Sequence, residues 1–138
     1  MSDPNDFPEV SAGTLARFEA NRTLIVSEVV ERSMRRQEEV VQHGEKARQA
    51  VTTGLDFTTK ALGIAMQLHN GEMLKQQLVW GADRLPHDGV ALQHILTRFR
   101  ILEDVIRDTL APADAEAVNH YADYMIELQE EFMKSAIP

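Results

Sequence analysis

The sequence predicts an all-α protein, a bundle of five to seven helices. From Ser11 onward, apolar residues recur at steps of three and four along nearly the whole chain, which is the period of one face of an α-helix. The sequence has no convincing run of alternating apolar and polar residues, and no hairpin dipeptide joins two β-branched runs. Glycines and prolines interrupt the helical pattern at intervals, so we expect the connections between the helices to be short.

The length predicts one domain. A chain of 138 residues can bury one sizeable core and is too short for two comfortable ones. We expect residues 1–10 to be a flexible N-terminal lead-in, with Phe7 or Val10 held against the body, and residues 11–138 to form the helical domain. Aromatic residues make up only 6% of the chain, so the core is expected to consist mostly of aliphatic side chains and methionine.

Charge and composition exclude several classes of function. The formal net charge is −8, which disfavours nucleic acid and anionic lipid as partners. The chain has no cysteine, so disulfides, thiolate metal sites and a cysteine nucleophile are excluded. No run approaches the roughly 20 apolar residues of a membrane span, and the first ten residues do not resemble a secretory signal. We therefore expect a cytoplasmic protein.

The first two helical regions are separated near Gly44. The first carries an apolar stripe and fades into a mixed Arg and Glu surface; the stripe consists of Leu15, Phe18, Arg22, Ile25 and Val29. The second region runs from Ala47 to Leu68. Thr53 and Asp56 have the spacing of a capping box. A second interpretation is therefore that this region forms two helices that meet near Gly54.

Three further helices follow. His69–Gly71 carries residues that end a helix in the left-handed conformation, and Pro86 ends the short helix after it. The cleanest helix ends near Leu110; its stripe is Leu92, Ile95, Phe99, Leu102 and Ile106. Pro112 suits the first turn of the last helix, with Asp114 near the positive end of its dipole.

No motif of known chemistry is visible. A di-iron bundle needs paired Glu-x-x-His motifs, and the sequence has none; it also lacks HExxH, GxSxG and a phosphate-binding glycine loop after a strand. Without a nucleophile, a base or a metal in convergent positions, we expect a protein that is not an enzyme and that holds no metal and no cofactor.

His94 and Trp80 are the only candidate cofactor-binding residues. His94 lies at the border of its helix's apolar stripe, where it is either an axial haem ligand or a satisfied border histidine. Trp80 is either the wall of a ligand pocket or a core anchor whose indole N–H bonds to a carbonyl. The border histidine and the core anchor are the favoured interpretations.

The order of these signals resembles the N-terminal sensor domains of RsbR-type stressosome proteins. A helix that ends "ALGIAMQLHNGE" precedes the short "LKQQLVWGADRLPHDGV" and the long "ALQHILTRFRILEDVIRDTL". The resemblance covers roughly Asp56 to Phe132, and the matching residues are Leu62, Leu68, Trp80, Arg84, Leu85, Gly89, Val90, Leu96, Phe99 and Leu102.

This resemblance implies a globin-like fold without haem, which dimerises and relays a signal through its C-terminal helix to an output domain or a downstream signalling protein. The given sequence stops at "EEFMKSAIP", so we expect either an excised sensor domain or a free-standing relative of that family. Two alternatives stay open: a haem- or tetrapyrrole-binding globin-type sensor, which a Soret band would reveal, and a ligand-free helical scaffold or adaptor. The signal and the output partner are not readable from the residues.

The expected dimer and coupling surface lies on the last helix. Its stripe has the three-four spacing of a coiled-coil seam and consists of Val118, Tyr121, Met125, Leu128 and Phe132. Tyr124 and Ile126 widen this stripe, and Leu24, Val26 and Val30 form a similar surplus on the first helix. Either a second copy covers this apolar surface, or it closes over the monomer's own core; we expect the second copy.

Overall fold

The protein is all-helical in a computed structural model, which describes residues 7, 9–36, 46–84 and 91–135. The described helices are α1 (Ala12–Met34), α3 (Ala47–Leu68), α4 (Glu72–Arg84), α5 (Leu92–Thr109) and α6 (Pro112–Ser135). These residues contain no strand, so the all-α prediction and its helix number are confirmed. Within the same ranges, none of the helices combines the length and the apolar character needed to cross a membrane.

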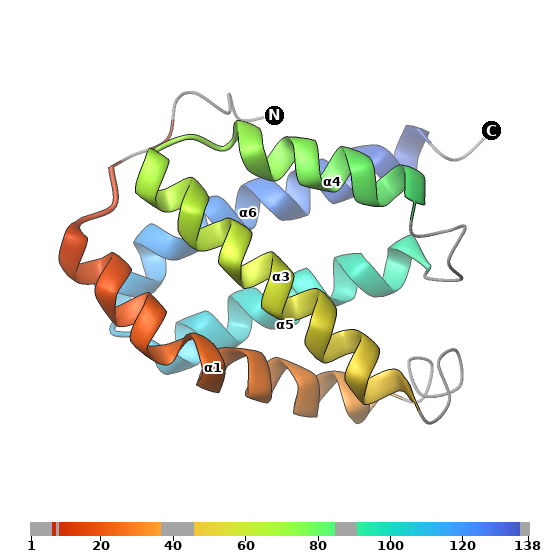
Figure 1. The fold of residues 1–138 in the computed structure, drawn as a ribbon, viewed down its shortest axis with the longest axis horizontal. Helices are drawn as coiled ribbons and strands as arrows, with labels where there is room; N and C mark the ends of the chain where they lie inside the picture. The colour runs from red at the N-terminus through yellow and green to blue at the C-terminus, as the bar shows by residue number, and fades with distance from the viewer. Residues whose placement is uncertain (1–6, 8, 37–45, 85–90, 136–138) are drawn as a thin grey trace.

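The helices pack around one apolar core (Figure 1). Leu110 and Ala111 join α5 to α6, so these two helices form a tight antiparallel hairpin. The α1 helix packs against α3 and α5, while α4 lies against α6 and α3. The α3 helix crosses in front of α5 in Figure 1. Residues of α3, α4, α5 and α6 line the cavity described below.

Helix α1 has the expected start and the expected buried face. The Ser11 hydroxyl caps it by accepting a hydrogen bond from the backbone N–H of Thr14 at 3.0 Å. Phe18, Ile25 and Val29 are fully buried, as the periodicity predicts. The expected break at Gly44 lies outside the described residues.

Helix α3 is continuous, so the possible division near Gly54 is wrong. The helix runs through Gly54 without interruption, and a Cβ atom at that position would meet no atom within 4 Å. Asp56 does not act in a capping box; its carboxylate accepts from Arg22 Nη1 at 2.7 Å and lies 3.1 Å from Lys60 Nζ. The Lys60 pair lies within α3, whereas the Arg22 pair ties α3 to α1.

The turn from α3 to α4 confirms the helix stop predicted at His69–Gly71. His69 itself takes the left-handed conformation, with φ 54°, and the Asn70 N–H reaches back to Ala65 O at 3.1 Å. The Asn70 side chain then accepts from the Glu72 N–H at 2.7 Å and starts α4. Gly71 is required for space, because a Cβ there would lie 2.6 Å from the Phe7 ring.

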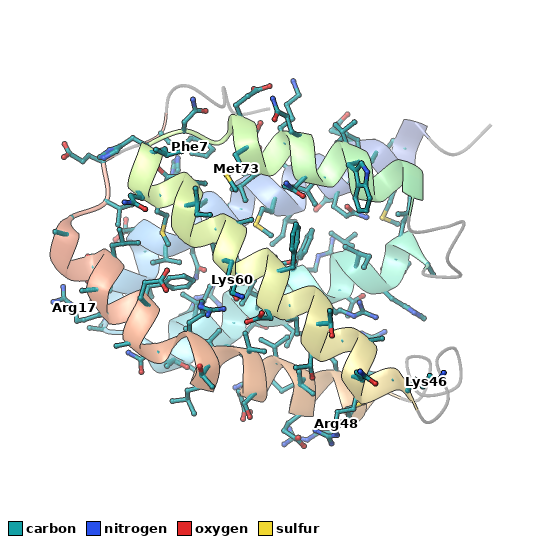
Figure 2. All side chains as sticks on the ribbon, in the orientation of Figure 1. Phe7, Arg17, Lys46, Arg48, Lys60 and Met73 are labelled. Atoms are coloured by element: carbon teal, nitrogen blue, oxygen red, sulfur yellow. The ribbon has the colours of Figure 1, made fainter. Side chains whose placement is uncertain are left out.

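Phe7 holds the N-terminal segment against the body, as expected. Its ring meets the rings of His120, Tyr121 and Tyr124 edge-on, at centroid distances of 5.2, 4.7 and 4.9 Å. Figure 2 shows Phe7 near the turn at which α4 begins. Val10 is also buried.

A half-buried carboxyl group lies between α5 and α6. Burial and the neighbouring Asp123 carboxylate raise the pKa of Glu103 from 4.5 to about 7, although Arg107, with Nη2 3.5 Å from Glu103 Oε1, opposes the shift. The unfolded chain ionises Glu103 at lower pH than the folded chain does. The folded state therefore loses stability as the pH rises from about 4.5 to about 7.

We predict that Glu103→Gln removes this pH dependence. Above pH 7 the variant should melt at a higher temperature than the unaltered protein, because it has no carboxylate to ionise beside Asp123. Below pH 5 the advantage should disappear. Thermal unfolding across this range measures the effect, and Glu116→Gln, which removes an exposed carboxylate from α6, is the control. The prediction would be contradicted if the melting temperatures of Glu103→Gln and Glu116→Gln changed with pH in the same way.

Candidate functional site

An apolar cavity of about 410 Å³ lies between four helices. Its volume falls within the range of roughly 300–1,000 Å³ that is typical of small-molecule sites. The helices α3, α4, α5 and α6 all contribute to it, whereas α1 does not. The described lining residues are Ala50, Thr53, Gly54, Leu55, Phe57, Thr58, Ala61, Leu74, Gln77, Leu78, Trp80, Gly81, Leu92, Ile95, Arg98, Phe99, Met125 and Gln129.

Two exposed aromatic side chains border the mouth of the cavity. Phe57 on α3 is 56% exposed and Trp80 on α4 is 60% exposed, and both also border a shallow outer hollow. The favoured interpretation of Trp80 as a core anchor is therefore wrong. Trp80 lines the cavity instead. Gly81, the next residue, is buried and lines the cavity too.

Two of the side chains that line the cavity are polar and buried. Arg98 on α5 is 6% exposed, and Gln129 on α6 is 2% exposed. The Gln129 amide donates to the backbone carbonyl of Leu92 at 3.2 Å, which ties α6 to the first residue of α5 beside the cavity. Among the described residues that line the cavity, Arg98 is the only charged one.

Sequence reasoning did not identify Arg98, Gln129 or Phe57 as site residues. A signal was present for the first two. Arg98 lies three residues after Ile95 and four before Leu102, and Gln129 lies four residues after Met125, so both are polar residues on apolar helix faces. A polar residue at a core position is the informative deviation from the pattern. Phe57 gave no such signal, because its exposure depends on how α3 and α4 meet.

None of the three histidines that the structure describes lines the cavity. His94 lies on α5 but is not a lining residue of the cavity, and none of the described lining residues is a histidine. His69 and His120 are exposed, at the end of α3 and on α6 respectively. Across the described ranges, no three His, Asp or Glu side chains form a group that could hold a metal ion. If one of the described histidines were an axial haem ligand, it would have to reach the haem from a position that does not line this cavity.

The expected coupling stripe of α6 is buried inside the chain's own core. Val118, Tyr121, Met125 and Leu128 are at most 1% exposed, and Phe132 packs partly buried against the same core. Tyr124, Val26 and Val30 are buried as well, so most of the surplus expected on α1 and α6 closes over the monomer. The periodicity identified the apolar face correctly, but α5 and α4 cover that face of α6. Of the five stripe residues, Met125 also lines the cavity.

Neither a comparison with models of known protein families nor one with curated proteins found a match for this chain. The candidate site therefore rests on its own geometry.

Proposed function

We propose that the chain is a haem-free, globin-like bacterial sensor domain that binds a small apolar molecule in the cavity between α3, α4, α5 and α6. The occupied cavity changes the packing of α6, and this helix relays the signal to an output domain or a downstream signalling protein. The observation that carries the proposal is the cavity itself, with its apolar walls and aromatic mouth. A stressosome-type role in the cytoplasm is the context that the sequence resemblance suggests.

The contacts of α6 give a route from ligand to signal. Met125 and Gln129 bring α6 to the cavity wall, and the Gln129–Leu92 hydrogen bond links it to α5. A ligand that presses on Met125 or displaces Gln129 would shift α6 relative to α5, because a packed interface moves between discrete arrangements. The lining also favours binding over catalysis, since its described residues include no carboxylate, histidine or serine.

Cavity filling tests the proposed binding. The neutral apolar dye phenylnaphthylamine should bind the full chain with one site and gain fluorescence. Gly54→Leu should weaken that binding at least about tenfold, because the new side chain projects into open space at the cavity wall. A leucine in a helix interior is favoured over glycine by about 1 kcal/mol, so unfolding would not explain the loss.

Thr52→Leu is the matched control for Gly54→Leu. Thr52 is exposed on the same helix and does not line the cavity, so its replacement should leave dye binding unchanged. Hydrogen exchange should show slower exchange in α6 when the dye binds the unaltered protein. No dye binding, or equal binding by both variants, would contradict the proposed function.

We also propose that the domain acts as a homodimer, with an interface other than the buried stripe of α6. The described large apolar side chains that remain exposed are Leu24, Phe57, Ile64, Leu68, Val79 and Trp80. Ile64 and Leu68 lie four residues apart on one face of α3, which makes that face the available apolar surface.

Light scattering should give the mass of two chains for the unaltered protein. The double variant Ile64→Glu with Leu68→Glu should give the mass of one chain, because carboxylates would be desolvated in the interface. Leu24→Glu places the same charge on an exposed position of α1 and should leave the dimer intact. A single-chain mass for the unaltered protein at micromolar concentration would refute the dimer.

A further inference from the structure

Among the described residues that line the cavity, the only charge is positive. Arg98 is nine-tenths buried at the wall of the cavity, and none of the other described lining residues carries a charge. A guanidinium stays protonated at all physiological pH values and presents several N–H donors in a planar fork. A ligand anion can therefore bond to Arg98 alongside groups of the chain itself. In an apolar enclosure of low dielectric, that attraction is stronger than in water.

The buried amide of Gln129 is a second polar group in the cavity wall. Gln129 comes from α6 and Arg98 from α5, so the two side chains approach the cavity from different helices. The rest of the wall is aliphatic or aromatic apart from Thr53, Thr58 and Gln77. This division predicts a ligand with one acid group and a large apolar body, because an apolar pocket with a few placed polar groups orients its ligand through them.

The mouth of the cavity favours a flat body. Phe57 and Trp80 stand on two different helices, border the same opening and leave more than half of their surface exposed. Exposed aromatic rings at an apolar opening present ring faces and edges to whatever enters. A planar ring system gains offset or edge-on contacts with them that a flexible alkyl chain does not gain.

We propose that the cavity binds an aromatic organic anion, with its ring system against Phe57 and Trp80 and its carboxylate or sulfonate group on Arg98. This inference rests on the proposed function, since it names the ligand class of the same site. It adds a requirement that the proposed function does not make, which is a preference for negative charge on the ligand.

Two dyes with nearly the same body test the charge preference. Anilinonaphthalene sulfonate carries a sulfonate, and phenylnaphthylamine is its neutral counterpart. Binding of each to the full chain is measured by dye fluorescence and by energy transfer from Trp80, the only tryptophan of the sequence. The sulfonate dye should bind the unaltered protein about tenfold more tightly or better, because a charge-assisted hydrogen bond is about twice as strong as a neutral one.

Arg98→Gln locates the preference. The variant should lose about tenfold to a hundredfold in affinity for the sulfonate dye and little for the neutral dye. Unchanged binding of the neutral dye shows that the variant is folded. Arg98→Lys keeps a charge without the fork and should fall between the two.

Phe57→Leu tests the aromatic contact at the mouth. It should lower the affinity for both dyes about threefold to tenfold, since it removes a ring and keeps an apolar side chain. Val79→Ala changes an exposed apolar neighbour of Trp80 that does not line the cavity, and should change neither affinity.

The outcomes separate the two proposals. The anion preference is overturned if the unaltered protein binds both dyes with equal affinity, or if Arg98→Gln keeps its affinity for the sulfonate dye. Neither result contradicts the proposed binding function. An affinity unchanged by Phe57→Leu overturns the aromatic contact. If neither dye binds the folded protein, the proposed function fails together with this inference.

Discussion

Phe99→Ala is expected to lower the free energy of unfolding by about 3–5 kcal/mol. Phe99 is 5% exposed in the centre of α5, and it belongs to the apolar core shared by the five helices. Its removal withdraws a large ring from the contacts with its neighbours and leaves a void that the surrounding helices can fill only in part. Chemical denaturation monitored by far-ultraviolet circular dichroism measures the change.

Phe57→Ala is the matched control for this prediction. Both phenylalanines border the same cavity, but Phe57 is more than half exposed and lies on α3. Its truncation should cost about 1 kcal/mol or less. Similar losses in the two variants would mean that α5 does not bury the face assigned to it.

The position of α5 was the part of the fold most readily predicted from the sequence. Phe99, Leu102 and Ile106 repeat at helical steps, and all three are buried in a helix that ends one residue before Leu110. Pro112 begins α6, as its fixed φ and missing N–H predict. Local signals of this kind are reliable because they act within a single turn of backbone.

The continuity of α3 and the cover of α6 depend on contacts between helices. Thr53 and Asp56 have the spacing of a capping box, yet the carboxylate of Asp56 pairs with Arg22 on α1 and the helix continues. The apolar stripe of α6 was recognised, but its spacing does not say whether a second copy or the same chain covers it. Periodicity identifies the buried face of a helix and not the identity of its neighbour.

The candidate site was the hardest part to predict. Its cavity exists because four helices separated in sequence leave a space, and residues on each of them contribute walls. The sequence allows Trp80 as a pocket wall or as a core anchor and favours the core anchor, whereas its side chain is exposed at the cavity. Arg98 and Gln129 stand where the pattern calls for apolar residues, and these two deviations are local signs of the site that the residues alone carry.

A partly buried polar network ties the start of α6 to the start of α1. Asp114 accepts from Arg17 Nε at 2.5 Å and from Arg17 Nη2 at 3.0 Å, and the Thr14 hydroxyl donates to it at 2.6 Å. These donors, with Arg17 first, lower the pKa of Asp114 from 3.8 to about 2. Asp114 also lies in the first turn of α6, where the helix dipole favours a negative charge.

Asp114→Asn should lower the melting temperature by several degrees at neutral pH, because the amide cannot accept the paired bonds of Arg17 as a carboxylate does. Since the folded pKa of Asp114 is lowered, its contribution is complete above pH 4 and is lost as the pH falls through about 2. The two proteins should therefore differ most above pH 4 and converge near pH 2. Thermal unfolding at pH values from 7 to 2 follows the convergence.

Asp108→Asn is the control. It breaks an exposed pair with Arg32, in which Arg32 Nη2 lies 2.9 Å from Asp108 Oδ2, and it should have a much smaller effect on the melting temperature at every pH. If Asp114→Asn has the same melting temperature as the unaltered protein at pH 7, the network does not hold α1 to α6. The packing of the apolar core alone then sets the position of α6, the helix proposed to carry the signal.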